Sequence, residues 1–237
     1  MASRNASFHE GVVADALLAP LKIGFVLLLG LLGIVVVAWI VDWTFVFKVW
    51  PEGVERLKGI LAADLARGIK LAEWQGGAPR VVTGTANFLY GLVFGVTGIH
   101  DMGLRFAQGT ALSIPDTIVR NSYLSNIDAI EVAMIGTQLL GVRLATLGMM
   151  APLLVLVYLV SAADGLTQRA IRRACGGRES ASLYHRAKHL QVMLLAMGGL
   201  LVLIQPVSID PRLVGVPVAC LVGILARLQW ACYKKHL

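Results

Sequence analysis

The fold class follows from one stretch of the chain, IGFVLLLGLLGIVVVAWIV, which occupies residues 23–41. It carries no charged side chain, and a helix of about 20 apolar residues is long enough to cross the hydrocarbon core of a bilayer. Trp39 lies near its end and Trp43 follows, where indole rings favour the membrane interface. The stretch is longer than the apolar core of a cleavable signal peptide, and no small-residue cleavage pattern follows it. We therefore expect a transmembrane helix that acts as a signal anchor.

Three further apolar runs occur in the second half of the chain. They occupy residues 144–163, 190–206 and 213–230, the last if Arg227 extends its guanidinium to the head groups. The composition agrees, because charged residues make up only 15% of the chain, whereas a soluble domain carries about 25%. We predict an all-α integral membrane protein with four transmembrane helices and a helical extracytoplasmic region.

A fifth candidate segment occupies residues 81–99. It is uncharged as well, but it is diluted by threonines, Asn87 and four glycines. Gly91 and Gly95 match the small-xxx-small pattern of helix contacts, although this spacing also arises by chance in such a stretch. We expect a re-entrant, interfacial or packed helix here. The alternative is an extra span, which would place the N-terminus outside.

The positions of lysine and arginine predict the orientation, since short cytoplasmic loops are enriched in both. The loop at residues 164–189 holds six basic and two acidic residues, and the stretch from Arg227 onward holds three basic residues and no acid. These two segments account for the whole net charge of +7. We therefore predict an outer hairpin at residues 207–212, with cytoplasmic segments at residues 1–22, 164–189 and 231–237.

In this topology residues 42–143 form a long external region, with nine basic and nine acidic residues. Long loops are nearly exempt from the charge rule. After Pro51, apolar residues recur at helical spacing at Val54, Leu57, Leu61 and Leu65. Charged residues such as Asp64 are predicted to lie outside this apolar stripe. We expect a first helix here and a second over residues 115–132 that leads into the next span.

Signals for catalysis are weak. His185 and His189 share one helical face, but no third metal ligand lies near them in the sequence, so we expect surface histidines and no metal site. His100 and Asp101 lack an accompanying nucleophile motif, and we expect them to cap a helix or lie at an interface. The sequence has no P-loop, dinucleotide fingerprint or zinc-finger spacing. It therefore predicts no cofactor and no enzymatic activity.

The loop at residues 164–189 is the best candidate for an interaction site. Gly176 and Gly177 divide it into two helical halves. Topology alone requires basic residues, whereas this loop also interleaves Glu, Tyr and His. We predict that it docks a cytoplasmic partner through Arg169, Arg172, Arg173, Gly177, Arg178, Glu179, Ser180, Tyr184, His185, Arg186 and Lys188. The alternatives are retention by acidic lipid and direct contact with DNA.

The same loop carries a resemblance to a known family. The motifs are Asp164-Gly165-Leu166, Arg172-Arg173, Gly177-Arg178-Glu179-Ser180, Tyr184-His185-Arg186-Ala187-Lys188, Pro206-Val207-Ser208, Asp210-Pro211 and the terminal Lys234-Lys235-His236-Leu237. From about residue 137 to the end, the sequence resembles the membrane proteins of integrating conjugative elements that are grouped as domain of unknown function 4400. The family commonly has Tyr where His236 stands.

The resemblance implies a bacterial inner-membrane component of a conjugation apparatus, which is a type IV secretion system carried on a mobile element. Such proteins look like accessories of the coupling ATPase that delivers DNA to the channel. We therefore expect a non-enzymatic membrane protein whose partners are lipid, the coupling ATPase and other apparatus proteins, and a homo-oligomer is compatible with this setting. The alternatives are a DNA- or lipid-binding membrane anchor and a small channel or transporter.

Overall fold

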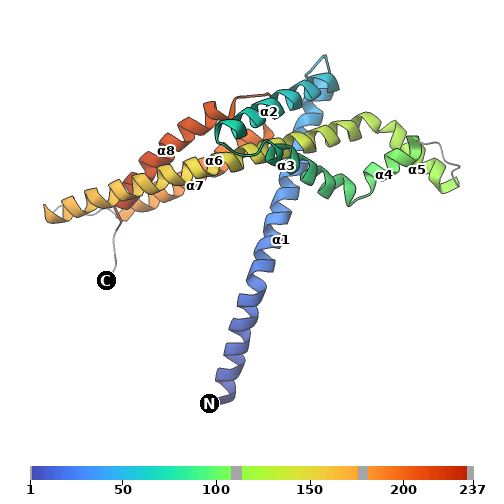
Figure 1. Cartoon of the computed structure of the whole chain (residues 1–237). Helices are drawn as coiled ribbons and strands as arrows, with labels where there is room; N and C mark the ends of the chain where they lie inside the picture. The colour runs from blue at the N-terminus through green and yellow to red at the C-terminus, as the bar shows by residue number, and fades with distance from the viewer. Residues whose placement is uncertain (1, 108–113, 176–180, 234–237) are drawn as a thin grey trace.

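The computed structural model describes residues 2–107, 114–175 and 181–233 (Figure 1). Every regular element in these ranges is a helix, which confirms the all-α fold class. The elements are α1 (Ala2–Lys48), α2 (Val54–Trp74), α3 (Arg80–Tyr90), the π-helix η1 (Gly91–Gly95), α4 (Ile99–Ala107), α5 (Ile114–Ser125), α6 (Ile127–Ala174), α7 (Ala181–Ile204) and α8 (Pro211–Ala231).

Four helices in the described part of the chain are long and apolar enough to cross a membrane. They are α1 from Lys22 onward, α6, α7 from Ser182 onward, and α8, and each coincides with one of the four predicted spans. The helix α7 ends at Ile204, two residues before the predicted end of its span. The helix α6 continues well past its predicted span, however. At about 1.5 Å per residue its 48 residues extend roughly twice the thickness of the hydrocarbon core. The first part of α6 therefore serves as a packing surface for other helices.

Helices α6, α7 and α8 lie side by side as a bundle (Figure 1). Glycines set the close approach of α6 to α8. A Cβ atom on Gly165 would lie 2.6 Å from the carbonyl oxygen of Arg227, and one on Gly223 would lie 3.0 Å from a methyl group of Val157. Small residues that let two backbones approach are typical of helix contacts within membranes.

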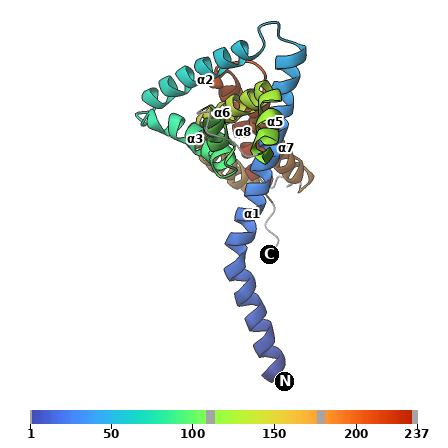
Figure 2. The same cartoon turned by 90° about the vertical axis from the view of Figure 1, so that its right-hand side faces the viewer.

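The helix α1 packs on the first part of α6 and then leaves the bundle, so that its N-terminal part projects away (Figures 1 and 2). Trp39 Nε1 donates a hydrogen bond of 2.9 Å to Thr137 Oγ1, and Trp43 Nε1 donates one of 2.9 Å to the carbonyl of Ala129. Between them Asp42 is buried against Gly136, which has no side chain to occupy that space. The predicted span ended at Val41, but α1 continues to Lys48 because this seam packs its last turns on α6.

Helices α2 and α3 flank the first part of α6 (Figure 2). Leu57 of α2 packs in one apolar cluster with Val132 of α6, and Val82 of α3 packs in another with Ala145. A Cβ atom on Gly141 would lie 2.6 Å from the Cα atom of Ala86, so α3 approaches α6 as closely as α8 does. The helix predicted after Pro51 is confirmed as α2.

The prediction of one continuous helix over residues 115–132 is wrong. The structure has α5 end at Ser125 and α6 begin at Ile127. The side chain of Asn126 donates a hydrogen bond of 2.8 Å to the carbonyl of Ser122, and its backbone N–H bonds to the carbonyl of Tyr123. Asparagine competes with helical hydrogen bonding in this way, which gives the chain a break at this residue.

The uncharged segment at residues 81–99 is not one straight helix. It runs through α3 and η1, and then the chain bends by 75° into α4. Gly98 supplies the positive φ of 71° that the bend requires. A Cβ atom on Gly91 or Gly95 would meet no atom within 4 Å, so the small-xxx-small pair makes no helix contact within the described chain.

Candidate docking surface and buried ion cluster

The predicted docking residues that the structure describes gather at one end of the bundle. Arg169, Arg172 and Arg173 lie in the last turns of α6, and Tyr184, His185, Arg186 and Lys188 lie in the first turns of α7. We call these seven residues the basic end. Gly177, Arg178, Glu179 and Ser180, together with Gly176, lie outside the described residues. The two helical halves predicted on either side of the glycines correspond to the end of α6 and the start of α7.

The basic end carries a surplus of exposed positive charge. Arg172, Arg173, Arg186 and Lys188 are all exposed. Asp164 is the acidic residue nearest to them in the described sequence. It forms an ion pair of 2.6 Å with Arg227. Its charge is therefore compensated within the bundle.

An aromatic cluster supports Arg169 at the basic end. The guanidinium of Arg169 lies 5.2 Å above the ring of Tyr233, which also contacts the rings of Tyr184 at 5.6 Å and Trp230 at 5.7 Å. Trp230 Nε1 donates a hydrogen bond of 3.0 Å to the hydroxyl of Tyr158. Residues of α6, α7 and the end of α8 thus form one unit.

The sequence analysis did not assign Tyr158, Trp230 and Tyr233 to this site. Enrichment of Tyr and Trp at the ends of membrane spans was the signal that could have indicated them. Their packing holds the arginine-bearing helix ends in fixed relative positions. A fixed set of guanidinium groups can bind carboxylates or phosphates through paired hydrogen bonds.

The histidines make aromatic contacts in the structure. His185 packs edge-on against Tyr184 at 5.2 Å, and His100 Nδ1 lies within hydrogen-bonding distance, 2.8 Å, of the Tyr90 hydroxyl. Among the described residues, no group of three or more His, Cys, Asp or Glu side chains could hold a metal ion.

A buried ion cluster that the sequence analysis missed lies where the first part of α6 meets α2 and the α7–α8 hairpin. Arg143 Nε donates a hydrogen bond of 2.9 Å to Asp64 Oδ2. Both residues are buried, with relative exposures of 3% and 7%. The hydroxyl of Ser208 also donates to Asp64 Oδ1, so both carboxylate oxygens have a donor.

The other two nitrogen atoms of the Arg143 guanidinium donate hydrogen bonds to carbonyl groups at and just after the end of α7. Its Nη1 atom donates to the carbonyls of Leu203 at 3.2 Å and Gln205 at 2.6 Å, and Nη2 donates to the carbonyl of Val207 at 3.3 Å. The last carbonyls of a helix lack partners within the helix, and an arginine suits the negative end of the helix dipole. Each of the three nitrogen atoms of this buried guanidinium therefore has an acceptor.

The prediction that Asp64 lies off the buried stripe is wrong. The buried positions of α2 are Leu57, Ile60, Asp64, Gly68, Leu71 and Ala72. They recur every three or four residues, as the apolar stripe does, but Val54, Leu61 and Leu65 are only partly buried. An aspartate becomes compatible with the buried face because Arg143 lies opposite, and Arg67 one turn along α2 adds a second cation 3.8 Å from its Oδ1 atom.

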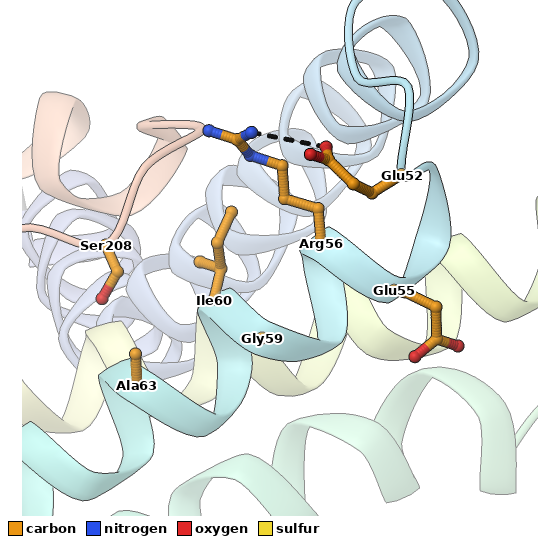
Figure 3. Close-up of a pocket in the computed structure, with 7 residues that line it drawn as sticks. All are labelled: Glu52, Glu55, Arg56, Gly59, Ile60, Ala63 and Ser208. Carbon is orange, nitrogen blue, oxygen red and sulfur yellow. Dashed lines mark hydrogen bonds and ion pairs between the residues drawn. The ribbon is translucent and has the colours of Figure 1, made fainter.

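An open hollow of about 450 Å³ lies beside this cluster, between α2 and Ser208 (Figure 3). Arg56 pairs with Glu52 at 3.4 Å, while Glu55 points away from the hollow and bonds to Lys58 at 2.9 Å. Hydrogen bonds to Glu55 and Glu131 hold the pKa of Lys58 above its ordinary value. These charges are compensated among themselves, so the hollow has less capacity for an ionic ligand than the basic end.

The comparison with protein families indicates the biological process in which the chain takes part. A model of the DtrJ-like family, described as IncC plasmid conjugative DNA transfer proteins, matches residues 50–234. No curated protein and no solved structure matches the chain. The expected relation to conjugation is confirmed, while the narrower grouping as domain of unknown function 4400 remains a prediction. Because the match covers well over half of the sequence, this chain belongs to the DtrJ-like family of conjugative DNA transfer proteins.

Proposed function

We propose that this protein is a non-enzymatic accessory of a type IV secretion apparatus, held in the bacterial inner membrane, that docks the coupling ATPase. Membership of the DtrJ-like family supports a role in conjugative DNA transfer. The observation that carries the docking role is the basic end, where exposed arginines project from helices fixed by an aromatic cluster. An acidic patch on the partner is the complementary surface.

The proposal includes an orientation with both termini and the basic end in the cytoplasm, where the ATPase acts. Its support is the crowding of Lys and Arg on residues 164–189 and after Arg227, against a balanced region at residues 42–143. The spans hold the protein beside the membrane helices of the partner. A homo-oligomer is compatible with this arrangement.

The test is co-purification of the coupling ATPase from membranes, together with the frequency of DNA transfer between cells. Arg172 and Arg173 are changed together to Glu, because both are exposed and neither lies in the buried core. A matched control changes Lys48 and Lys70 to Glu, which alters the net charge equally at exposed positions of α1 and α2. We expect the first variant to lose the ATPase and transfer, and the control to retain both.

Two further measurements distinguish loss of docking from a change of orientation and from direct DNA contact. Charge reversal near a span can alter orientation, so the labelling of Cys175 from each side of the membrane must stay unchanged in the variant. Retention of the ATPase and normal transfer by the Arg172→Glu, Arg173→Glu variant would refute the docking role. Loss of transfer with the ATPase retained, combined with salt-dependent DNA affinity of the purified protein, would favour direct DNA contact.

A further inference from the structure

The segment at residues 81–99 is apolar on both of its sides. One side of α3 and η1 is buried in the protein, where Leu89 has a relative exposure of 1% and Phe94 of 2%. The other side presents Val81, Phe88 and Val96, which are exposed by 51%, 67% and 79%. Exposed large apolar side chains that lie close together are typical of a surface that meets a membrane or a protein partner. Within the described residues, no side chain covers this outward side.

Contacts with α1 place this segment at the depth of a membrane span. Val93 and Phe94 of η1 belong to one apolar cluster with Val35 and Ala38 of α1, and Leu31 packs against the same cluster. The rings of Trp39 and Phe94 lie 5.9 Å apart. These α1 residues lie within the charge-free run at residues 23–41. The apolar surface of η1 is therefore continuous with that of a span.

The threonine hydroxyls and the N–H groups at the bend bond within the segment, which lowers the cost of placing them in hydrocarbon. The hydroxyls of Thr85 and Thr97 donate to the carbonyls four residues earlier, at 2.8 and 2.7 Å. At the bend, the N–H of Val96 bonds to the carbonyl of Gly91 and that of Gly98 to the carbonyl of Gly95. The exposed amide of Asn87 costs far less in an apolar phase than a charge would.

We propose that α3, η1 and the bend form a re-entrant segment inside the membrane, and that its outward side contacts the acyl chains of lipids. The segment is bounded by Arg80, the first residue of α3, and by His100 and Asp101 after the bend, so charges occur only at its two ends. The bend of 75° turns α4 away from the direction of α3 and η1, so the segment does not cross the layer as one straight helix. This surface is separate from the basic end and does not depend on the docking role.

The test places a spin label on single cysteines in the full-length protein, reconstituted in vesicles of phosphatidylethanolamine and phosphatidylglycerol. The native Cys175, Cys220 and Cys232 are first replaced by Ala. Labels then go to Phe88 and Val96, with Leu29 of α1 as the lipid-facing control and Glu55 of α2 as the water-facing control. Collision rates with oxygen, which partitions into lipid, and with a water-soluble nickel chelate are measured for each label.

We expect Phe88 and Val96 to behave as Leu29 does, with an oxygen-to-nickel ratio several-fold above that at Glu55. A nickel collision rate equal to that at Glu55 would show a water-facing segment and overturn the proposal. Low collision rates with both reagents would also overturn it, because a second copy of the chain would then cover this side. Melting temperatures of the labelled variants, compared with the unlabelled parent, confirm that they are folded.

Reporter fusions after residues 75 and 110 test the re-entrant path separately. A re-entrant segment places both reporters on the same side of the membrane. Reporters on opposite sides would show a complete fifth span, and the re-entrant assignment would be wrong.

Discussion

Arg143 connects α2, α6 and the end of α7 through the hydrogen bonds of one side chain. Its guanidinium bonds to Asp64 of α2 and to three carbonyls at the end of α7, while its backbone belongs to α6. A buried ion pair adds little stability over apolar residues of the same size, but breaking one leaves an uncompensated charge. The cluster therefore matters most when a single partner is lost.

The Arg143→Met substitution is expected to lower the free energy of unfolding by about 3 kcal/mol, because Asp64 stays buried and keeps only the partly exposed Arg67, 3.8 Å away, as a cation. The Asp64→Leu substitution should act in the same direction. The double variant should recover part of the loss, since no charge is then buried unpaired. Recovery stays incomplete because the carbonyls of Leu203, Gln205 and Val207 lose their donors.

Denaturation of the purified protein in detergent micelles measures these differences as a double-mutant cycle. Lys70→Met is the matched control, because Lys70 is exposed on the same helix as Asp64, and it should change stability by less than about 0.5 kcal/mol. Equal effects of Arg143→Met and Lys70→Met would contradict a role for the ion cluster in stability.

Among the helices, the contact between α6 and α8 depends on glycine rather than on large side chains. Gly165 and Gly223 bring the two backbones together at separate levels of the bundle. Within a membrane such close packing is a main source of helix association, because lipid chains are as apolar as the side chains they compete with. The position of Arg169, Arg172 and Arg173 in the basic end follows from this contact, since α6 carries these three arginines.

The Gly165→Ala substitution is expected to destabilise the protein by about 1–3 kcal/mol, because the added methyl group would overlap the carbonyl of Arg227. Thermal unfolding of the purified variant measures the loss. Gly148→Ala on the same helix is the control, as its Cβ atom would meet nothing within 4 Å. Alanine at that position should be neutral or slightly stabilising. A melting temperature of Gly165→Ala at or above that of Gly148→Ala would contradict the close contact.

At the scale of the whole molecule, charge and apolar surface are segregated. The long apolar helices are bordered by a basic end on one side of the bundle and by the balanced charges around α2 on the other. Positive charge close to spans is retained in the cytoplasm. The orientation proposed for docking is therefore testable without any partner.

Cys175 reports that orientation, because it lies at the basic end and is exposed. A maleimide that cannot cross the bilayer should leave Cys175 unlabelled from outside and should label it in inverted membrane vesicles. The Cys175→Ser variant identifies the labelled residue, since Cys220 and Cys232 remain in it. Labelling of Cys175 from outside the inner membrane would reverse the topology and remove the basis for cytoplasmic docking.

The sequence by itself determined the class of the protein. Charge-free runs of about 20 residues predict helices that are long and apolar enough to cross a bilayer, because a helix satisfies its own backbone hydrogen bonds there. It also located the arginines of the basic end, because their spacing and composition are local features. Family membership likewise depends on sequence alone.

Only the tertiary structure decided which residues meet across the bundle. Periodicity placed Asp64 outside the buried stripe, since a carboxylate alone would be costly there, and its partner Arg143 lies 79 residues away in the chain. The support of Arg169 by Tyr233 and the contact of η1 with α1 are similarly long-range. A hydrophobic pattern fixes which side of a helix is apolar, but the energy of a buried charge depends on what another helix places opposite it.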